Sequence, residues 1–570
     1  MKKRLTKTAN REPGGNLKRV IRSCASILFL LLPLLICSST LLAQTAFSVL
    51  RGTVTDPNGA ALPGVKIAVT DLATNITVRA VTTDNNGNFE IPDLKLGSYR
   101  LNAEKAGFRA YVADNVLLDA GQTRRLDFAL PIGEATETVT VEAGAALITN
   151  ETGTISGEID KRKFTDQPAV DVYPSPLSML TTVPGIQGNG WNIVISGVSD
   201  RNKQTWAMDG VANDTTGDQN DNPNFFATVQ VATVTPGADS ARSVNFNMVS
   251  KRGENTFHGQ VFYRHLNSAL NTRGFFDPRK APYIQHEWEG EASGPIWKDR
   301  THFYFGWFHQ SIPLGSSIQR TVPTLNMRQG IFSTFIKDPL LSGKCDASDQ
   351  TACFRDGGVL NKIPANRMNP LSLKIQDSYY PTPNLGGPNA LTNNFNWIFP
   401  HNSDLYKGDW PFVRIDHKLT SNNSLFFRWS QRKTPYIRPG GTPELTWTQA
   451  RDHRQTVISD THLFSSRLIN SFTFGRQTDF LFIGEEEQGF QPLFGDEVVK
   501  TLGLQGVNRT NFHTQGFPQI AISGLTTLSS NNGGIDNVDR DDGINTYLDT
   551  LTWATGKHVL KVGGEFRQLL

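Results

Sequence analysis

The sequence is poor in cysteine and nearly neutral in charge. It contains 4 cysteines among 570 residues, and its 56 Lys and Arg nearly balance 53 Asp and Glu, for a net charge of +3. So small a net charge gives no argument for nucleic-acid binding. A mean hydropathy of −0.33 excludes a protein built mainly from membrane-spanning helices. The 50 Gly, 34 Phe and 10 Trp residues instead indicate β structure with many turns.

Catalytic motifs are also missing. The sequence has no phosphate-binding loop and no Gly-x-Ser-x-Gly pattern. His286-x-x-Glu289 resembles a zinc site, but on an alternating strand an offset of three puts the two side chains on opposite faces. Residues 537–543 (N-x-D-x-D-D-G) resemble a calcium loop whose glycine comes one place late, and a solvated acidic loop end is the preferred interpretation. The sequence therefore predicts no enzyme activity, no cofactor and no metal site.

Residues 1–43 are predicted to be a signal peptide. Lys and Arg concentrate in residues 1–22, an apolar core follows at Ile27–Ile36, and small residues at Ser38–Ala43 provide a cleavage site. The alternative is an uncleaved membrane anchor, because the apolar stretch runs to about 20 residues. Pro33 and the polar residues after Cys37 favour cleavage. Export leads to an oxidising compartment, in which disulfides persist.

Two cysteines lie outside this targeting segment, Cys345 and Cys353. They belong to the longest predicted loop, with seven residues between them. In an oxidising compartment this spacing predicts a disulfide that closes a small loop. Two free thiols are the alternative.

Residues 47–131 have the pattern of a small β-sandwich. Short stretches rich in β-branched residues alternate with turn residues, as at 56–59 (D-P-N-G) and 85–87 (N-N-G). The predicted strands are Val49–Thr55, Val65–Asp71, Ile76–Thr83, Asn88–Ile91, Ser98–Lys105, Val112–Leu118 and Thr123–Leu130.

Four motifs in this segment resemble the carboxypeptidase-regulatory-like domain. They are residues 52–59 (G-x-V-x-D-x-x-G), 62–65 (L-P-G-V), 83–89 (T-D-x-x-G-x-F) and 94–101 (L-x-x-G-x-Y-x-L), followed by Gly107-Phe108. The resemblance implies a transthyretin-like β-sandwich that is not itself catalytic.

Residues 144–254 are irregular and contain two motifs that resemble the plug domain of TonB-dependent receptors. These are 193–198 (I-x-I-S-G-V) and 206–211 (W-A-M-D-G-V), while residues 237–259 resemble the junction between plug and barrel in the Oar-like branch of that family. Ser196 departs from the family pattern, in which many plugs carry Arg, so no contact is carried over to that position. The resemblance implies a mixed α/β plug domain. Its motif residues here are Gly197, Asp209, Gly210 and Arg242.

The stretch 136–143 (T-E-T-V-T-V-E-A) connects the sandwich to the plug. Its alternating β-branched and polar residues predict a strand, and no hairpin partner is evident in the neighbouring sequence. One interpretation is the last strand of the sandwich, and the other is a strand that adds to a sheet edge of another protein. Its place before the plug resembles that of the TonB box, which pairs with a TonB-type inner-membrane energy-transducing protein. The residues assigned to this box are Glu137, Thr138, Val139, Thr140 and Val141.

Residues 255–570 contain nine alternating stretches, each about long enough to cross a membrane as a β-strand. In the fifth, Phe427 and Trp429 share one face while Arg428 lies on the other. An apolar face toward lipid and a polar face toward a lumen are typical of outer-membrane barrels, although a soluble sandwich also alternates. The stretches are His258–His265, His286–Ala292, His302–Gln310, Phe412–Leu419, Leu425–Gln431, Thr456–Phe464, Leu468–Gln477, Tyr547–Ala554 and His558–Arg567.

The connections between these stretches alternate strictly between short and long, as periplasmic turns and external loops do in barrels. The long ones are Leu266–Gln285, Ser311–Pro411, Arg432–Gln455 and Thr478–Thr546. Nine strands leave the last one ending at the outer face, whereas single-chain bacterial barrels have an even number of strands. The sequence therefore predicts an open, curved sheet around a plug and a C-terminally incomplete barrel.

The predicted fold is all-β dominated: a transthyretin-like sandwich, a mixed α/β plug domain, and a partial antiparallel transmembrane barrel of about nine strands over residues 255–570. The resemblance implies a TonB-dependent receptor in the outer membrane, surrounded by lipid, with the sandwich and coupling strand in the periplasm. It would bind a solute (siderophore, glycan or peptide) at its external loops and plug and import it. The alternative is a non-transporting surface protein, an adhesin or secretion-related receptor, on the same scaffold.

Overall fold

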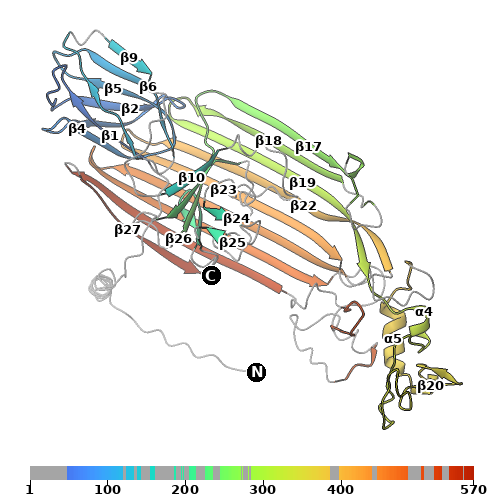
Figure 1. Cartoon of the computed structure of the whole chain (residues 1–570). Helices are drawn as coiled ribbons and strands as arrows, with labels where there is room; N and C mark the ends of the chain where they lie inside the picture. Colours follow the sequence, from blue (N-terminus) through green and yellow to red (C-terminus); the bar gives the residue numbers. More distant parts are fainter. Residues whose placement is uncertain are drawn as a thin grey trace, which may run out of the picture.

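A computed structural model shows the chain as a small sandwich, a group of short strands and a long curved sheet (Figure 1). The residues that it describes are 48–119, 123–133, 138–142, 155–160, 185–187, 194–195, 197, 204–212, 225–234, 244–270, 272–273, 280, 284–385, 397–439, 446–485, 502–505, 519–528, 538–555 and 558–570.

The sandwich consists of two sheets that bury alternate residues between them. In β1, Leu50 and Val54 are fully buried, whereas Arg51 and Thr53 are partly exposed. One sheet has the order β4-β1-β7, with β8 also pairing with β1, and the other has the order β3-β2-β5-β6-β9. The strands are β1 (Ser48–Thr55), β2 (Lys66–Asp71), β3 (Ile76–Thr82), β4 (Asn88–Leu94), β5 (Gly97–Glu104), β6 (Ala110–Leu118), β7 (Thr123–Arg125), β8 (Phe128–Ala129) and β9 (Thr138–Glu142).

The stretch predicted as the coupling strand is β9, the last strand of the second sheet. It runs parallel to β6, with Ala110 opposite Thr138 and Asp114 opposite Glu142. Four residues (134–137) connect it to Gly133 and twelve (143–154) connect it to the next strand. The sequence offered no hairpin partner, and the structure supplies a parallel one whose first residue precedes that of β9 by 28 positions (110 to 138). Local turn signals do not reveal such a pairing.

The region that the sequence predicts to be a plug (residues 144–254, called the plug region below) has seven short strands among its described residues. Five of them form one sheet in the order β10-β15-β16-β13-β14, and the other two pair with each other. The described residues of this region include no α-helix. The strands are β10 (Ile155–Asp160), β11 (Ile186–Gln187), β12 (Val194–Ile195), β13 (Gln204–Met208), β14 (Val211–Ala212), β15 (Phe226–Val234) and β16 (Val244–Ser250).

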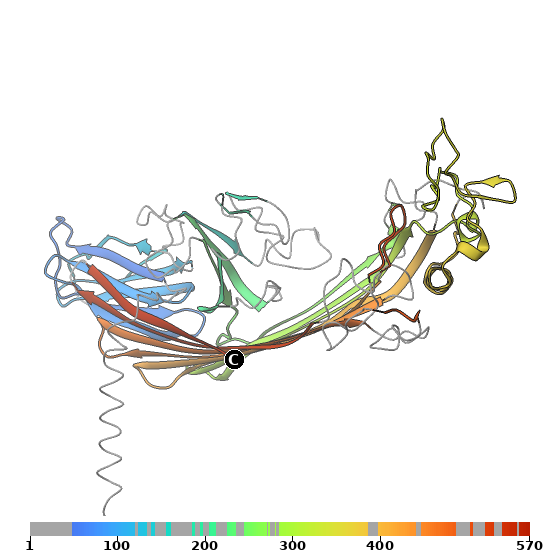
Figure 2. The same cartoon turned by 90° about the horizontal axis from the view of Figure 1, so that it is seen from below.

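The long sheet contains nine antiparallel strands in sequence order, from β17 to β27. Within the described residues, β17 and β27 each pair with one neighbour only, so this sheet is open. It is strongly curved, and the sandwich and the plug strands lie on its inner side (Figure 2). The strands are β17 (His258–Asn267), β18 (Ile284–Trp297), β19 (Thr301–Arg320), β22 (Trp397–Lys418), β23 (Asn423–Pro439), β24 (Thr446–Leu463), β25 (Leu468–Glu485), β26 (Val538–Thr555) and β27 (His558–Leu569).

Side-chain exposure in the long sheet follows the predicted alternation. Arg428 is fully buried on the inner side, whereas the adjacent Phe427 is 37 % exposed on the outer side. Cross-strand pairing keeps the same faces together, and Arg414 on β22 therefore lies opposite Arg428. The exposed outer face carries large aromatic side chains from five strands, namely Trp288, Trp307, Phe427, Phe472 and Trp553.

The predicted boundaries were wrong at all four long connections, because the strands on both sides extend further than expected. The predicted long connection 432–455 is mostly strand, because β23 extends to Pro439 and β24 begins at Thr446. Residues 538–543, expected in an acidic loop end, belong to β26, where Arg540 pairs with Asp542 at 2.6 Å. Polar residues outnumber apolar ones in both segments, so they lack the regular alternation by which the shorter stretches were recognised.

A small subdomain lies at the far end of the sheet from the sandwich (Figure 1). It has its own core, in which Val322, Tyr379 and Tyr380 pack with Leu528. Among the described residues, no helix is both long enough and apolar enough to cross a membrane. The short elements of the subdomain are α4 (Leu325–Arg328), β20 (Arg355–Asp356), β21 (Val359–Leu360), η5 (Ala365–Arg367) and α5 (Pro370–Tyr379), and η4 (Ser268–Leu270) follows β17.

The subdomain contains a disulfide between Cys345 and Cys353, the pairing that the sequence predicted. Closing a loop of this length is worth about 2–3 kcal/mol in the chain-entropy model. We expect both thiols to resist alkylation until the protein is reduced, as measured by mass spectrometry of the purified chain. Alkylation of both cysteines without reductant would contradict the bond.

Candidate functional site

The candidate site is built around Asp209, in a two-residue turn between β13 and β14. Met208 pairs with Val211, and the two residues between them have positive φ angles, 50° at Asp209 and 82° at Gly210. Asp-Gly is a preferred sequence for such a hairpin turn, because Gly and Asp tolerate the left-handed conformation. The turn therefore fixes where the Asp209 carboxylate points.

The carboxylate of Asp209 is held by the end of β16. The Ser250 backbone N–H donates to Oδ1 at 2.9 Å, and the Ser250 hydroxyl donates to Oδ2 at 2.8 Å. These two bonds join the turn to the last strand of the plug region, immediately before the chain enters the long sheet.

Two arginines of the long sheet approach the same carboxylate. Arg428 Nε lies 2.9 Å from Asp209 Oδ2, and Arg414 Nη1 lies 3.4 Å from Oδ1. Arg414 also donates to the Ser250 hydroxyl oxygen at 2.6 Å. All three charged side chains are at most 5 % exposed. Removal of one partner would therefore leave buried charge without compensation.

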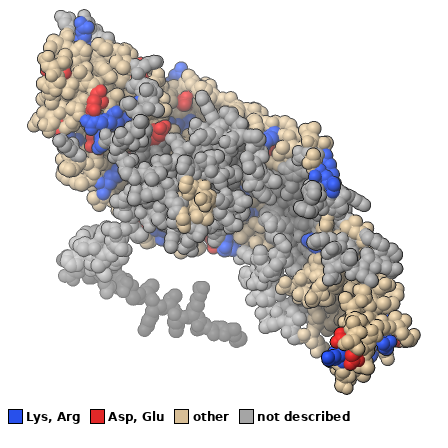
Figure 3. All heavy atoms as spheres, in the orientation of Figure 1, with Lys and Arg blue, Asp and Glu red and all other residues tan. Residues whose placement is uncertain are grey.

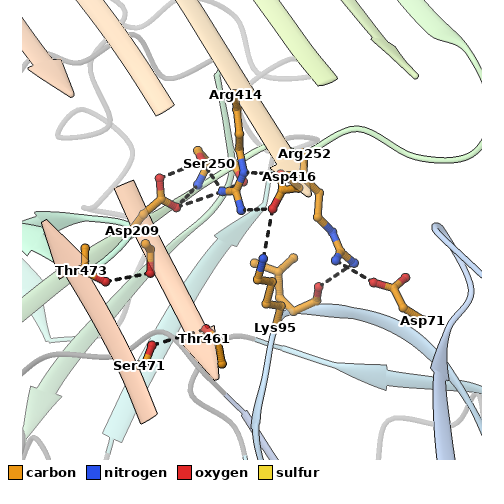
Figure 4. Close-up of polar contacts among 12 residues, drawn as sticks. Asp71, Lys95, Asp209, Ser250, Arg252, Arg414, Asp416, Thr461, Ser471 and Thr473 are labelled. Atoms are coloured by element: carbon orange, nitrogen blue, oxygen red, sulfur yellow. Dashed lines mark hydrogen bonds and ion pairs between the residues drawn. The ribbon is translucent and has the colours of Figure 1, made fainter. Parts of the chain in front are cut away.

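The charged contacts continue from Arg414 into the sandwich (Figure 4). Arg414 binds Asp416 in a bidentate manner, at 2.7 and 2.9 Å, and Lys95 Nζ lies 3.0 Å from Asp416 Oδ1. A second link joins Arg252, just after β16, to Asp71 of the sandwich at 2.6 Å. We call these residues and Asp209, Ser250 and Arg428 the junction cluster. It has four cations and three carboxylates, and it joins the sandwich, the plug region and the long sheet.

Burial shifts the charged groups on the sandwich side of the cluster. Burial lowers the pKa of the Lys95 ammonium group, and the Asp416 carboxylate opposes this effect. Burial likewise disfavours the charge of Arg252, but Asp71 and the Tyr99 hydroxyl outweigh it, so the pKa of Arg252 is raised. Both contacts to the sandwich are thus between oppositely charged groups with restricted access to water.

A cavity of about 90 Å³ lies beside the junction cluster. Asp209 and Ser250 line one side, Lys95 lines another, and hydroxyls from β24 to β26 line the opposite wall. The Ser459 and Thr473 hydroxyls of that wall lie 2.8 Å apart (Figure 4). The lining also contains apolar side chains, among them Val249, Phe426 and Leu548. The plug region and the sheet are therefore not tightly packed against each other on this side.

A second charged group lies on the same inner face. Arg451 on β24 binds Asp479 on β25 in a bidentate manner, at 2.8 and 2.7 Å, and both side chains are buried. The ring of His453 lies beside them, 3.5 Å from Asp479. The inner face of the sheet thus carries charged and hydrogen-bonding groups, whereas the outer face carries the exposed aromatics. Figure 3 shows the molecule from the side on which the sandwich and the plug strands lie, and basic and acidic side chains are mixed there over the sandwich and the far subdomain.

The structure places some of the predicted site residues and not others. Asp209 and Gly210 form the turn at the centre of the cluster, and Gly197 has a φ of 81° that favours glycine. Glu137 and Arg242 lie outside the described residues. His286 and Glu289 lie on opposite faces as expected, His286 against Tyr263 on the outer side and Glu289 buried on the inner side.

The sequence-based analysis missed the roles of Arg414, Asp416 and Lys95. A signal was present in the predicted membrane strands, where Arg428 lies on the face opposite to the aromatics. Ionisable residues within membrane-crossing segments are costly and usually have a specific partner. A partner of Arg428 is Asp209. The two residues are so far apart in the sequence that no local pattern could indicate their contact.

Comparison with known families identifies the protein class. The model of the outer membrane beta barrel domain matches residues 249–570, more than half of the chain. The chain belongs to this family. A second model, the carboxypeptidase regulatory-like domain, matches residues 49–131 and confirms the resemblance stated for the sandwich. The protein is therefore an outer-membrane β-barrel protein with a carboxypeptidase-regulatory-like domain.

One curated relative is similar to a large part of the chain. The TonB-dependent transporter Oar from Myxococcus xanthus is 28 % identical over 283 residues, which are 45 % of this chain and 26 % of that protein. The chain thus spans about a quarter of the length of this relative. With the two family matches, it confirms the resemblance to Oar-like TonB-dependent receptors.

Solved structures give weaker similarities. The siderophore receptor PirA from Acinetobacter baumannii is 13 % identical with a TM-score of 0.38, over 72 % of this chain and 47 % of that one. The alcaligin outer membrane receptor FauA from Bordetella pertussis is 11 % identical with a TM-score of 0.37, over 75 % and 57 % of the two chains. These alignments are too weak to locate any residue of the site.

Proposed function

We propose that this chain acts as a TonB-dependent outer-membrane receptor, which binds a solute and imports it when coupled to an inner-membrane energy transducer. In this proposal residues 47–131 form the sandwich, 136–143 the coupling strand, 144–254 the plug and 255–570 the barrel wall, after a signal peptide at 1–43. The coupling strand and sandwich face the periplasm. The proposed solute is a siderophore, a glycan or a peptide.

One observation carries the proposal. The turn at Asp209 is bound to Arg414 and Arg428 on the inner face of the sheet, so a segment outside the wall strands occupies the inner side of the wall. A segment held there by charged contacts blocks the lumen and is at the same time removable. When such a segment moves away from the wall, its charged groups can exchange these contacts for hydration, which apolar side chains cannot do. Moving this segment for import needs an energy source other than the barrel wall, and in this proposal the inner-membrane transducer supplies it.

Uptake experiments test the proposal. Cells that carry the gene are given labelled siderophores, glycans or peptides, with and without a protonophore. We expect surface binding of the correct solute to persist with the protonophore while accumulation inside the cell stops. A solute that accumulates equally with the protonophore would contradict coupled import. Binding without any import would support the adhesin-like alternative.

A further inference from the structure

A second cavity, of about 100 Å³, lies between the sandwich and the end of the long sheet that is nearest to it. Strands β2 to β5 of the sandwich form one side. The other side comprises the segment after β16, the turns that follow β18 and β22, and the end of β24. Lys95 and Arg252 line both this cavity and the one beside Asp209. Cavities between domains are common ligand sites.

The lining of this second cavity carries an excess of positive charge. It contains five Lys and Arg side chains and three Asp side chains, so two positive charges are left over when His is counted as neutral. All three carboxylates have cationic partners, at 2.6 Å (Asp71 to Arg252), 3.0 Å (Asp416 to Lys95) and 3.4 Å (Asp93 to Lys561, which is outside the lining). The remaining cations of the lining are Arg79, Arg300 and Lys418.

Lys418 and Arg300 are bound to backbone carbonyl groups. The Lys418 ammonium group donates to the Thr77 carbonyl of β3 at 3.1 Å. The Arg300 guanidinium donates to the Lys418 and Leu419 carbonyls at 3.3 and 3.2 Å, and it lies over the Trp297 ring. Among the described residues, neither cation forms an ion pair with a carboxylate. Neutral groups therefore surround both charges.

Arg79 is the most buried of the three cations, with an exposure of 7 %. It donates to the Val78 and Asp93 carbonyl groups at 2.8 and 3.4 Å. Burial lowers the pKa of the Arg79 guanidinium, and the nearby Asp93 carboxylate and Tyr99 hydroxyl only partly oppose this effect. The charge of Arg79 is thus incompletely compensated, and an anion in the cavity would stabilise it.

We propose that this cavity binds a dianionic phosphate group, free or part of a monoester, which Arg79, Arg300 and Lys418 hold. Two negative charges match the excess positive charge of the lining. Guanidinium groups present paired N–H donors that fit the oxygens of a phosphate, and the ammonium group adds three more donors. A volume of about 100 Å³ corresponds to several waters, which a phosphate group displaces. This site does not depend on whether the chain imports a solute.

Titration of the purified chain with potassium phosphate tests the site. At about pH 8 phosphate is mostly dianionic, and potassium chloride keeps the ionic strength constant. We expect saturable binding with a Kd below roughly 1 mM by isothermal titration calorimetry, and at least about tenfold weaker binding by Lys418→Gln and by Arg300→Gln. The matched control is Lys105→Gln, which should bind phosphate like the wild type. The Lys105 ammonium group also donates to a backbone carbonyl, that of Pro63 at 2.6 Å, but it lies outside the cavity.

Three results would overturn the proposal. They are the absence of saturable binding up to about 10 mM phosphate, equal affinities of the wild type and Lys418→Gln, and displacement of phosphate by an equal concentration of acetate. Glycerol phosphate distinguishes the two sources of the group. Tighter binding of glycerol phosphate than of inorganic phosphate supports a monoester as the ligand, and tighter binding of inorganic phosphate supports the free ion.

A second measurement does not require the variants to fold. Phosphate should raise the midpoint of urea unfolding of the wild-type chain above its value in chloride at the same ionic strength, because a ligand that binds the folded state stabilises it. An unchanged midpoint would contradict the phosphate site.

Discussion

Replacing Val139 and Thr140 by proline is expected to abolish energised uptake while leaving solute binding at the cell surface unchanged. Consecutive residues of a strand direct their N–H groups to opposite edges, so the two prolines remove one donor from each edge of β9. No strand can then complete a ladder on either side. The external loops, which are part of the proposed solute site, lie at the other end of the sheet from the sandwich and keep their structure.

The measurement compares protonophore-sensitive accumulation with surface binding of the same labelled solute. The matched control is Val139→Thr with Thr140→Val, which keeps the backbone donors and the β-branched character of the strand. We expect wild-type uptake from this control. Uptake by the proline variant at the wild-type rate would show that β9 does not transmit energy.

The second large effect is expected from Asp209→Ala. It would leave Arg414 and Arg428 without their shared carboxylate, and both are buried. Removing one partner of a buried ion pair typically lowers the free energy of unfolding by about 3–5 kcal/mol. We expect the lower part of this range, because Arg414 retains its bidentate contact with Asp416. The lost stability should appear as a lower midpoint of urea unfolding of the purified chain.

A surface ion pair in the sandwich provides the control for this substitution. Arg125 and Asp127 lie 2.8 Å apart, and both are about half exposed. We expect Asp127→Ala to change stability by less than about 1 kcal/mol, since exposed pairs contribute little. Equal urea midpoints for the Asp209 and Asp127 variants would show that the junction cluster does not stabilise the plug region.

The strands of the long sheet were predictable because their two faces meet different surroundings. Apolar Phe427 and buried Arg428 alternate for that reason, and each predicted stretch coincides with an observed strand, two of them extending one residue too far, at Leu419 and Phe464. Strand ends were not predictable. Beyond the apolar band both faces of β23 and β24 carry polar residues, so periodicity no longer distinguishes strand from loop.

The site was predictable in part. The Asp209-Gly210 pair indicates a tight turn from local chemistry alone. Its contact with Arg414 spans 205 positions in the sequence and depends on how the plug region lies against the sheet. The parallel pairing of β9 with β6 could not be predicted for a similar reason. Parallel strands are not joined by a hairpin turn, so no turn motif in the sequence indicates that they pair.

The two segments that connect β9 to the sandwich and to β10 differ in length, so they limit the movement of β9 to different extents. Residues 134–137 allow the strand to move only about 17 Å from Gly133 when fully extended, whereas residues 143–154 reach about 45 Å toward β10. In the proposed function, a transducer that moves β9 by more than about 17 Å from Gly133 must therefore move the sandwich with it, whereas the connection to β10 permits a separation of about 45 Å. A small displacement of β9 would tilt the sandwich and strain its contacts at Asp71 and Lys95. Only a larger displacement of β9 would pull on the proposed plug.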